Sequence, residues 1–261
     1  MRVASIQMAV VEGDKTATIA QALKKIDRCG GVDLIILPEI WNVGFMSFDR
    51  YHAEAEDFHG QTLTALTAAA KAVGAYLHTG SLVERVEDKY YNSSYLLSPQ
   101  GRIVANYRKI HLFGYKSKET QLLSPGEEAV VVETPLAKIG LATCYDLRFP
   151  ELFRRMVDQG AELFLVCSAW PYPRLEAWIM LNRVRALENQ CYLVSANSCG
   201  LNMGAVFAGH SMVSDPWGVI LAGAGDEETI VEANLDIAQV QEIRHRFPPL
   251  ADRRDWLQSR S

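Results

Sequence analysis

The chain has 261 residues, of which 49% are hydrophobic, 22% charged and 9% aromatic. This composition is typical of a globular protein and excludes a disordered one, which would be poorer in apolar residues. The formal net charge of −5 and the lack of a basic run argue against binding to nucleic acid or to an anionic membrane surface. Composition and charge together favour a compact protein that acts on a small molecule.

The first half of the chain alternates strand patterns with helix patterns. Its expected strands cover residues 3–10, 33–37, 75–82, 90–97 and 102–107, and its expected helices cover 16–28 and 62–73. In the second half we expect strands at 130–133, 137–143, 163–167, 191–196, 206–214 and 219–222, and helices at 150–159, 174–189 and 236–246. No Gly/Ser-rich linker or charge block interrupts this pattern, so we expect one domain over 1–261.

Two segments, 94–104 and 211–221, resemble each other. Each one is typical of a strand, a turn with proline and glycine, and a second strand. The similarity admits two interpretations. It is either a coincidence between two hairpins or the mark of a pseudo-symmetric fold with two related sheets.

Five cysteines are dispersed along the chain without a C-x-x-C pair. This odd set indicates free thiols in a reducing compartment, which we expect to be the cytoplasm, rather than a disulfide framework. The N-terminus begins directly with strand-like alternation and has no long apolar segment. We therefore expect neither a signal peptide nor a membrane span.

Three polar residues follow apolar strands, where α/β proteins gather their ligand sites: Glu39, Lys109 and Cys144. Cys144 lies at a predicted strand-to-helix corner. Such a corner exposes a nucleophile and leaves backbone N–H groups free to stabilise an oxyanion. The alternative is a buried structural thiol, which is our interpretation of the other four cysteines.

A cysteine nucleophile reacts as the thiolate, so it needs a base or a nearby cation. None of the six histidines lies in a context that marks it as this base. Burial raises the pKa of carboxyl groups and makes them better bases, and Glu39 follows four aliphatic residues and a proline. Lys109 could lower the thiol pKa or hold an oxyanion. The alternatives are a solvated loop carboxylate and a surface lysine.

The segments 37–39 (LPE), 107–113 (YRKIHLF) and 144–151 (CYDLRFPE) contain these three residues in the order Glu, Lys, Cys. Together they resemble the signature segments of the nitrilase, or carbon–nitrogen hydrolase, superfamily. The resemblance continues through residues 168–171, 183–189 and 215–218 and covers essentially the whole chain. It implies an α/β (α+β) fold, a four-layer αββα sandwich with two pseudo-symmetric mixed sheets.

The resemblance also implies a catalytic triad of Glu39, Lys109 and Cys144. The implied reaction is hydrolysis of the C–N bond of a small linear amide, aliphatic or ω-amide, to an acid and ammonia through a cysteine thioester. The substrate carbonyl is expected between the Lys109 ammonium and the backbone N–H of Tyr145. A nitrilase or an N-carbamoyl amino-acid hydrolase with the same triad is the alternative.

Members of this superfamily often carry a further active-site glutamate between the lysine and the cysteine. Glu119 fits that place best, and Glu127 and Glu128 remain alternatives. No cofactor and no metal are implied, because the chain lacks a Walker loop, a Rossmann fingerprint and the H-E-x-x-H spacing. The complete triad disfavours a non-catalytic scaffold, and the lack of a resolving cysteine disfavours a redox protein.

Aromatic residues beside the motifs are candidates for substrate binding, namely Tyr145, Trp170 and Tyr115, although aromatics lie in cores and interfaces about as often. The basic residues Lys116, Lys118 and Arg174 either attract an acidic substrate or carry ordinary solvated charge. Family members commonly dimerise through helices beside the active site. A homodimer or larger homo-oligomer is therefore expected, formed by the helices predicted over 150–159 and 174–189.

Overall fold

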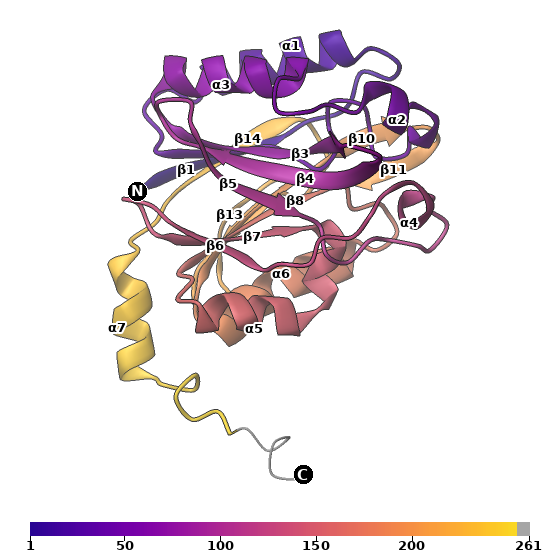
Figure 1. Cartoon of the computed structure of the whole chain (residues 1–261). Coiled ribbons are helices and arrows are strands. Elements are labelled where there is room, and N and C mark those ends of the chain that lie inside the picture. The colour runs from indigo at the N-terminus through magenta and orange to yellow at the C-terminus, as the bar shows by residue number, and fades with distance from the viewer. Residues whose placement is uncertain (255–261) are drawn as a thin grey trace.

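The computed structural model of the chain describes residues 1–254, which form two stacked β-sheets with helices on their outer faces (Figure 1). Helices α1 (Lys15–Asp27) and α3 (Gln61–Val73) cover one sheet, and α5 (Pro150–Asp158) and α6 (Leu175–Asn189) cover the other. This order of helix, sheet, sheet and helix is the four-layer αββα sandwich that the sequence predicted. The predicted single domain over 1–261 includes residues 255–261, which lie outside the described residues.

Each sheet has six strands. The first contains, in spatial order, β14 (Thr229–Asn234), β1 (Arg2–Gln7), β2 (Leu34–Ile36), β3 (Tyr76–Val86), β4 (Lys89–Leu97) and β5 (Ile103–Arg108). The second contains β6 (Val130–Glu133), β7 (Lys138–Thr143), β8 (Leu163–Ser168), β9 (Tyr192–Asn197), β12 (Met212–Ser214) and β13 (Ile220–Gly223).

The two sheets have the same topology. Each has three parallel strands at its centre, β1-β2-β3 in the first sheet and β7-β8-β9 in the second. Each also has an antiparallel hairpin at one edge, β4-β5 or β12-β13, and a single antiparallel strand at the other edge. The two similar hairpins of the sequence thus occupy equivalent positions, and the pseudo-symmetric interpretation is correct.

Three apolar cores separate the four layers, and β2 shows how the sequence builds them. Its central residue, Ile35, packs into the core under α1 and α3. Its neighbours Leu34 and Ile36 face the second sheet, where Leu165 and Val194 belong to the same core. Because successive side chains of a strand point to opposite faces, an uninterrupted apolar run marks a strand that is covered on both faces.

The predicted strand over 206–214 is wrong, because the chain turns in its middle. Residues Ala205–Ala208 form β11, which pairs with β10 (Cys199–Asn202) in a separate two-stranded sheet. Gly209 and His210 then both adopt positive φ angles, +63° and +51°, and extended backbone cannot continue through them. Only from Met212 does the chain join the second sheet, as β12.

Most other predicted elements are present with shifted ends, including the last helix, α7 (Ala238–Arg246). Strands β10 and β14 were not predicted. The short helices α2 (Tyr51–Glu54) and α4 (Glu119–Leu122) were also missed, since four residues give too little periodicity to recognise.

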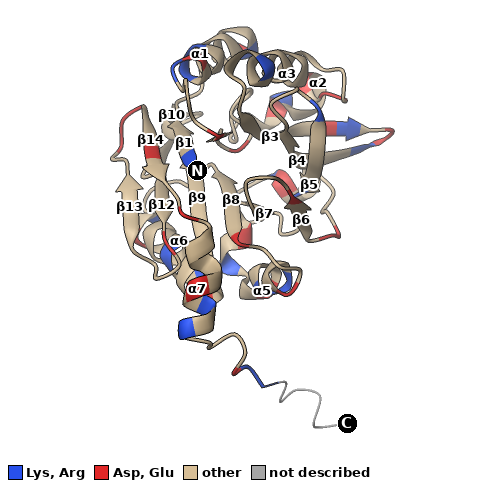
Figure 2. Ribbon diagram, turned by 90° about the vertical axis from the view of Figure 1, so that its left-hand side faces the viewer, with Lys and Arg blue, Asp and Glu red and all other residues tan. Residues whose placement is uncertain are grey.

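All five cysteines are buried free thiols. None of the helices within residues 1–254 is long and apolar enough to cross a membrane. Basic and acidic positions are interspersed over the elements in Figure 2.

A bulge in β3 supports the loop that follows β2. The register of β3 shifts between His78 and Ser81, and Gly80 within the bulge has a φ of +64°. The backbone N–H of Ser81 donates to the carbonyl oxygen of Pro38 at 3.0 Å. A Cβ at Gly80 would lie 2.0 Å from that same oxygen, so only glycine allows the two segments to approach this closely.

We expect Gly80→Ala to lower the free energy of unfolding by about 2 kcal/mol or more, because the left-handed backbone and the steric overlap both disfavour it. Gly30→Ala is the matched control, since a Cβ there meets no atom within 4 Å. Urea unfolding of both variants measures the difference. Equal stability of the two variants would show that the bulge tolerates a side chain.

Candidate active site

The predicted corner at Cys144 is present. Strand β7 ends at Thr143, and Cys144 begins a short 3-10 helix with a φ of +47°, a left-handed conformation that costs a non-glycine residue about 1–3 kcal/mol. Asp146 stabilises the turn, because its carboxylate accepts a hydrogen bond from the Thr143 N–H at 2.9 Å. Its own backbone N–H donates to the Thr143 hydroxyl, which completes a capping box.

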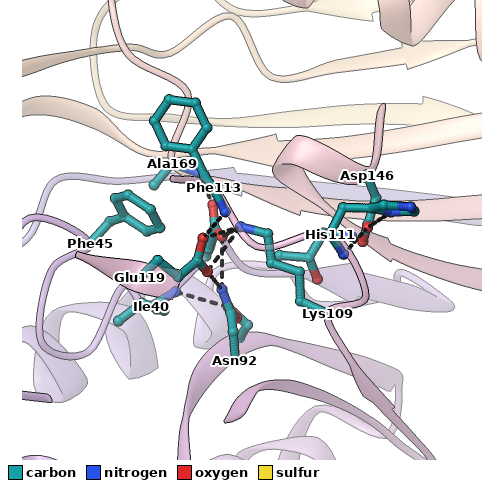
Figure 3. A network of polar contacts seen from close by, with 12 residues as sticks. Ile40, Phe45, Asn92, Lys109, His111, Phe113, Glu119, Asp146 and Ala169 are labelled. Carbon is teal, nitrogen blue, oxygen red and sulfur yellow. Dashed lines mark hydrogen bonds and ion pairs between the residues drawn. The ribbon is translucent and has the colours of Figure 1, made fainter. Parts of the chain in front are cut away.

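Lys109 lies at the end of β5, with its side chain completely buried between two carboxylates (Figure 3). Its Nζ is 2.7 Å from Oε1 of Glu39 and 3.0 Å from both carboxylate oxygens of Glu119. Both glutamates are also completely buried. A buried charge is destabilising unless it is paired and hydrogen-bonded, and here each charge has a partner.

The two carboxylates accept further hydrogen bonds from neighbouring groups. Asn92 Nδ2 donates to Oε1 of Glu39 at 2.9 Å and to Oε1 of Glu119 at 2.8 Å, so this amide joins the two. The other oxygens accept from backbone, Glu39 Oε2 from the Ala169 N–H and Glu119 Oε2 from the Phe113 N–H. Four hydrogen bonds from these three groups, in addition to the contacts with the ammonium, thus fix the orientation of both carboxylates.

Of the candidates for the further glutamate, Glu119 is the one that contacts Lys109. Glu127 and Glu128 instead line a separate polar cleft with Arg108. Asn92 was missed by the sequence reasoning, because an isolated asparagine within a strand matches no motif. The feature that distinguishes Asn92 is its complete burial inside β4, and only the structure reveals this burial.

Burial alone would lower the pKa of Lys109, but Glu119 and Glu39 more than compensate and hold that pKa well above its usual value. Lys109 is therefore an ammonium ion. Burial raises the pKa of Glu119, and the negative charge of Glu39 acts in the same direction, while Lys109 opposes both. The net effect is a pKa of Glu119 above its usual value.

The Cys144 side chain is 7% exposed, and burial raises the pKa of its thiol well above the usual value. The charge of Glu39 raises it further, whereas Lys109 and a hydrogen bond with Ser168 lower it. Cys144 is thus a neutral thiol in the unliganded protein. The thiolate needs a proton acceptor at the moment it forms.

Cys144 opens into a cavity of about 190 Å³. All three predicted binding residues line this cavity: Tyr145, Trp170 and Tyr115. Trp170 is buried, at 3% exposure, whereas Tyr115 is 63% exposed. The remaining lining side chains are mostly apolar, among them Phe45, Phe113 and Phe207.

Three basic residues also line the cavity, namely Lys116, Arg148 and Arg174. Each lies over an aromatic ring, at centroid distances of 5.6, 5.0 and 5.4 Å respectively. No ion pair between described residues involves any of the three. Lys118, which the sequence also suggested, is not among the lining residues. The sequence predicts that Arg148 pairs with Glu151 beside the corner, and this is wrong, because no ion pair between described residues joins the two and Arg148 lines the cavity instead.

Comparisons with known proteins agree with this geometry. Residues 2–245 match the model of the carbon-nitrogen hydrolase family. The chain is 37% identical to a 2-oxoglutaramate amidase of Paenarthrobacter nicotinovorans, over 97% of this chain and 89% of that protein.

Two solved structures share the fold. A CN-hydrolase superfamily protein from Xanthomonas campestris matches with a TM-score of 0.92 and 30% identity, and 98% of each chain is covered. A mutant amidase from Nesterenkonia sp. AN1 carries the acetamide moiety of fluoroacetamide on its active-site cysteine. It matches with a TM-score of 0.83 and 27% identity, over 95% of this chain and 96% of that one. With the predicted sandwich and signature segments in place, this chain belongs to the carbon-nitrogen hydrolase family.

Proposed function

We propose that the protein is an amidase that hydrolyses small linear amides to a carboxylic acid and ammonia. The observation that carries the proposal is the position of Lys109, buried between Glu39 and Glu119, together with a left-handed cysteine on the wall of a small cavity. Glu39, Lys109 and Cys144 are the proposed catalytic residues, and Glu119 assists them.

The first step is binding of the amide with its carbonyl oxygen between Lys109 Nζ and the backbone N–H of Tyr145. Tyr145 lies in the first turn of the 3-10 helix, where a backbone N–H has no acceptor within the helix. Both donors are fixed before the substrate arrives, so they stabilise the oxyanion without reorganisation. Removal of one such donor typically lowers the rate about 100- to 1000-fold.

In the second step Cys144 Sγ forms a bond to the carbonyl carbon while its proton passes to the Glu39 carboxylate. The tetrahedral intermediate collapses when the C–N bond breaks, and Glu39 returns the proton to the departing ammonia. A thioester on Cys144 remains. Water then attacks it, with Glu39 again accepting a proton, and releases the carboxylic acid and the thiol.

Glu119 holds Lys109 in place through two contacts of 3.0 Å and is itself held by Asn92 and Phe113. We assign it an orienting role for the ammonium and for the substrate amide. Tyr145, Trp170 and Tyr115 form the walls against which the acyl chain packs.

Amides that also carry a carboxylate, the ω-amides of dicarboxylic acids, are the proposed preferred substrates. A cavity of about 190 Å³ accommodates only a small acyl chain, and its three cations lack a carboxylate partner within residues 1–254. The name of the 37% identical relative, a 2-oxoglutaramate amidase, supports the same class.

The working unit is proposed to be one domain over 1–261, in a reducing compartment such as the cytoplasm, since the thiol of Cys144 must stay reduced.

A homodimer is proposed on the basis of α6. Its exposed Met180 and Leu187 line a groove beside Trp217, also exposed, and large apolar patches of this kind mark interfaces.

Replacing Glu39 with glutamine separates proton transfer from the shape of the site. Because Glu39 raises the pKa of the Cys144 thiol, Glu39→Gln lowers that pKa and increases the thiolate fraction at pH 7. We expect amide turnover to fall at least about 100-fold. We also expect alkylation of Cys144 by iodoacetamide, followed by intact mass, to become faster than in the unmodified protein, where it accelerates as the pH rises.

The control for this experiment is Cys144→Ala, which should show neither turnover nor an adduct. Ammonia release by Cys144→Ala would exclude the thioester route. Full turnover by Glu39→Gln would remove Glu39 from the proton transfers.

The carboxylate preference is tested with succinamic acid and its neutral analogue butanamide. We expect Arg148→Gln and Arg174→Gln to lower kcat/KM for the acid about 10- to 100-fold, because a charge-assisted hydrogen bond is lost, with little effect on the neutral amide. Lys118→Gln is the control. Unchanged discrimination in both arginine variants would contradict the assignment, and so would faster ammonia release from nitriles or N-carbamoyl amino acids.

Light scattering at micromolar concentration should give twice the monomer mass of 29.1 kDa. Leu187→Glu should shift the protein to the monomer, because it places a charge in the apolar groove. A monomeric unmodified protein would contradict the dimer.

A further inference from the structure

Asp146 is the centre of a hydrogen-bond network beside the site (Figure 3). Its side chain is completely buried and accepts four hydrogen bonds. Oδ2 accepts from the Tyr107 hydroxyl at 2.6 Å and from the Thr143 N–H at 2.9 Å. Oδ1 lies 3.1 Å from the His111 backbone nitrogen and 2.7 Å from its ring Nδ1.

On one side this network holds the segment that carries Lys109. Tyr107 precedes Lys109 by two residues and His111 follows it by two, and both are bonded to the same carboxylate. The Tyr107 hydroxyl also accepts from the N–H of Ile110 at 3.3 Å. The backbone on both sides of the lysine is therefore attached to Asp146.

On the other side the network holds the turn that carries Cys144. Thr143 precedes the cysteine by one residue, and Asp146 follows it by two and caps the 3-10 helix. One buried carboxylate thus joins the segments that present the ammonium and the thiol. These segments begin on different sheets, since Lys109 follows β5 and Cys144 follows β7.

The chemistry of the donors suits an ionised Asp146. Burial and the neighbouring Asp146 raise the pKa of Tyr107 well above its usual value, so the hydroxyl keeps its proton and donates it. Two backbone N–H groups donate as well, and an ionised carboxylate can only accept. His111 therefore donates its Nδ1 proton to Asp146.

The network also reaches the cavity wall through aromatic contacts. The His111 ring stacks on Phe149 with centroids 3.7 Å apart and an interplanar angle of 5°. Phe149 meets Tyr145 edge-on at 5.2 Å, and Tyr145 lines the cavity. The His111 ring thereby supports the residue whose backbone N–H faces the oxyanion in the proposed mechanism.

We propose that Tyr107, His111 and Asp146 are positioning residues that fix Lys109 relative to Cys144 across the two sheets. This inference rests on the proposed function, since the rate that these residues influence is that of amide hydrolysis. The three residues are assigned no contact with the substrate. A displacement of about 1 Å between reacting groups can lower a rate about 100-fold, so loss of one tether should appear in kcat.

The first test compares two buried tyrosines, one in each sheet. Tyr107 is bonded to Asp146, while Tyr192 in β9 is bonded to Gln239 of α7. We expect Tyr107→Phe to lower kcat for succinamic acid about 10-fold, with KM within about twofold. Tyr192→Phe should keep kcat within about twofold. Equal kcat in the two variants, at equal melting temperatures, would overturn the proposal.

The second test separates the donor of His111 from its ring. His111→Phe keeps an aromatic ring on Phe149 but cannot donate to Asp146, whereas His111→Asn places an amide donor near the position of Nδ1. We expect kcat to fall about 10- to 100-fold in His111→Phe and to recover largely in His111→Asn. A fall in His111→Asn with unchanged kcat in His111→Phe would mean that the stacked ring matters and the tether does not.

Cys144→Ala distinguishes the proposed function from the positioning network. Turnover by Cys144→Ala removes the proposed function itself. An inactive Cys144→Ala, together with unaffected Tyr107→Phe and His111→Phe, removes only the positioning network.

Discussion

The pairing of one buried ammonium with two buried carboxylates is the constraint on which the rest of the site depends. Lys109 follows β5 and Glu39 follows β2, whereas Glu119 is the first residue of α4. Removal of one partner from such a cluster typically costs about 3–5 kcal/mol, because it leaves a buried charge uncompensated. Folding therefore requires the three segments to converge. Phe113 and Ala169, whose backbone N–H groups donate to these carboxylates, also line the cavity.

The charges of this cluster also influence the pKa of the Cys144 thiol. Glu39 opposes ionisation of Cys144 and Lys109 favours it, and with burial the net effect keeps the thiol neutral. Such a thiol is protected from oxidation and alkylation, which act on thiolates. In the proposed mechanism the Cys144 sulfur becomes reactive when a carbonyl oxygen binds beside Lys109, because the negative charge then passes from the sulfur to that oxygen.

The sequence was sufficient for features that depend on local pattern. The apolar run of β2 predicts a strand covered on both faces, and the ordered segments around Glu39, Lys109 and Cys144 predict the family. Features that depend on distant partners were missed. Strand β14 exists because it pairs with β1 at the other end of the chain, and Asn92 matters only because it lies between Glu39 and Glu119. Neither relation is visible in a short stretch of sequence.

The two sheets are equivalent in topology, yet the site belongs to neither alone. Strands β2 and β8 occupy the same place in their sheets, and the segments after them meet. The Glu39 N–H donates to the Ser168 carbonyl at 3.2 Å, and the Ala169 N–H donates to the Glu39 carboxylate at 2.9 Å. Asp146 makes a second link of this kind between β5 and β7. The proposed base comes from the first sheet and the nucleophile from the second, so the chemistry requires that the halves pack together correctly.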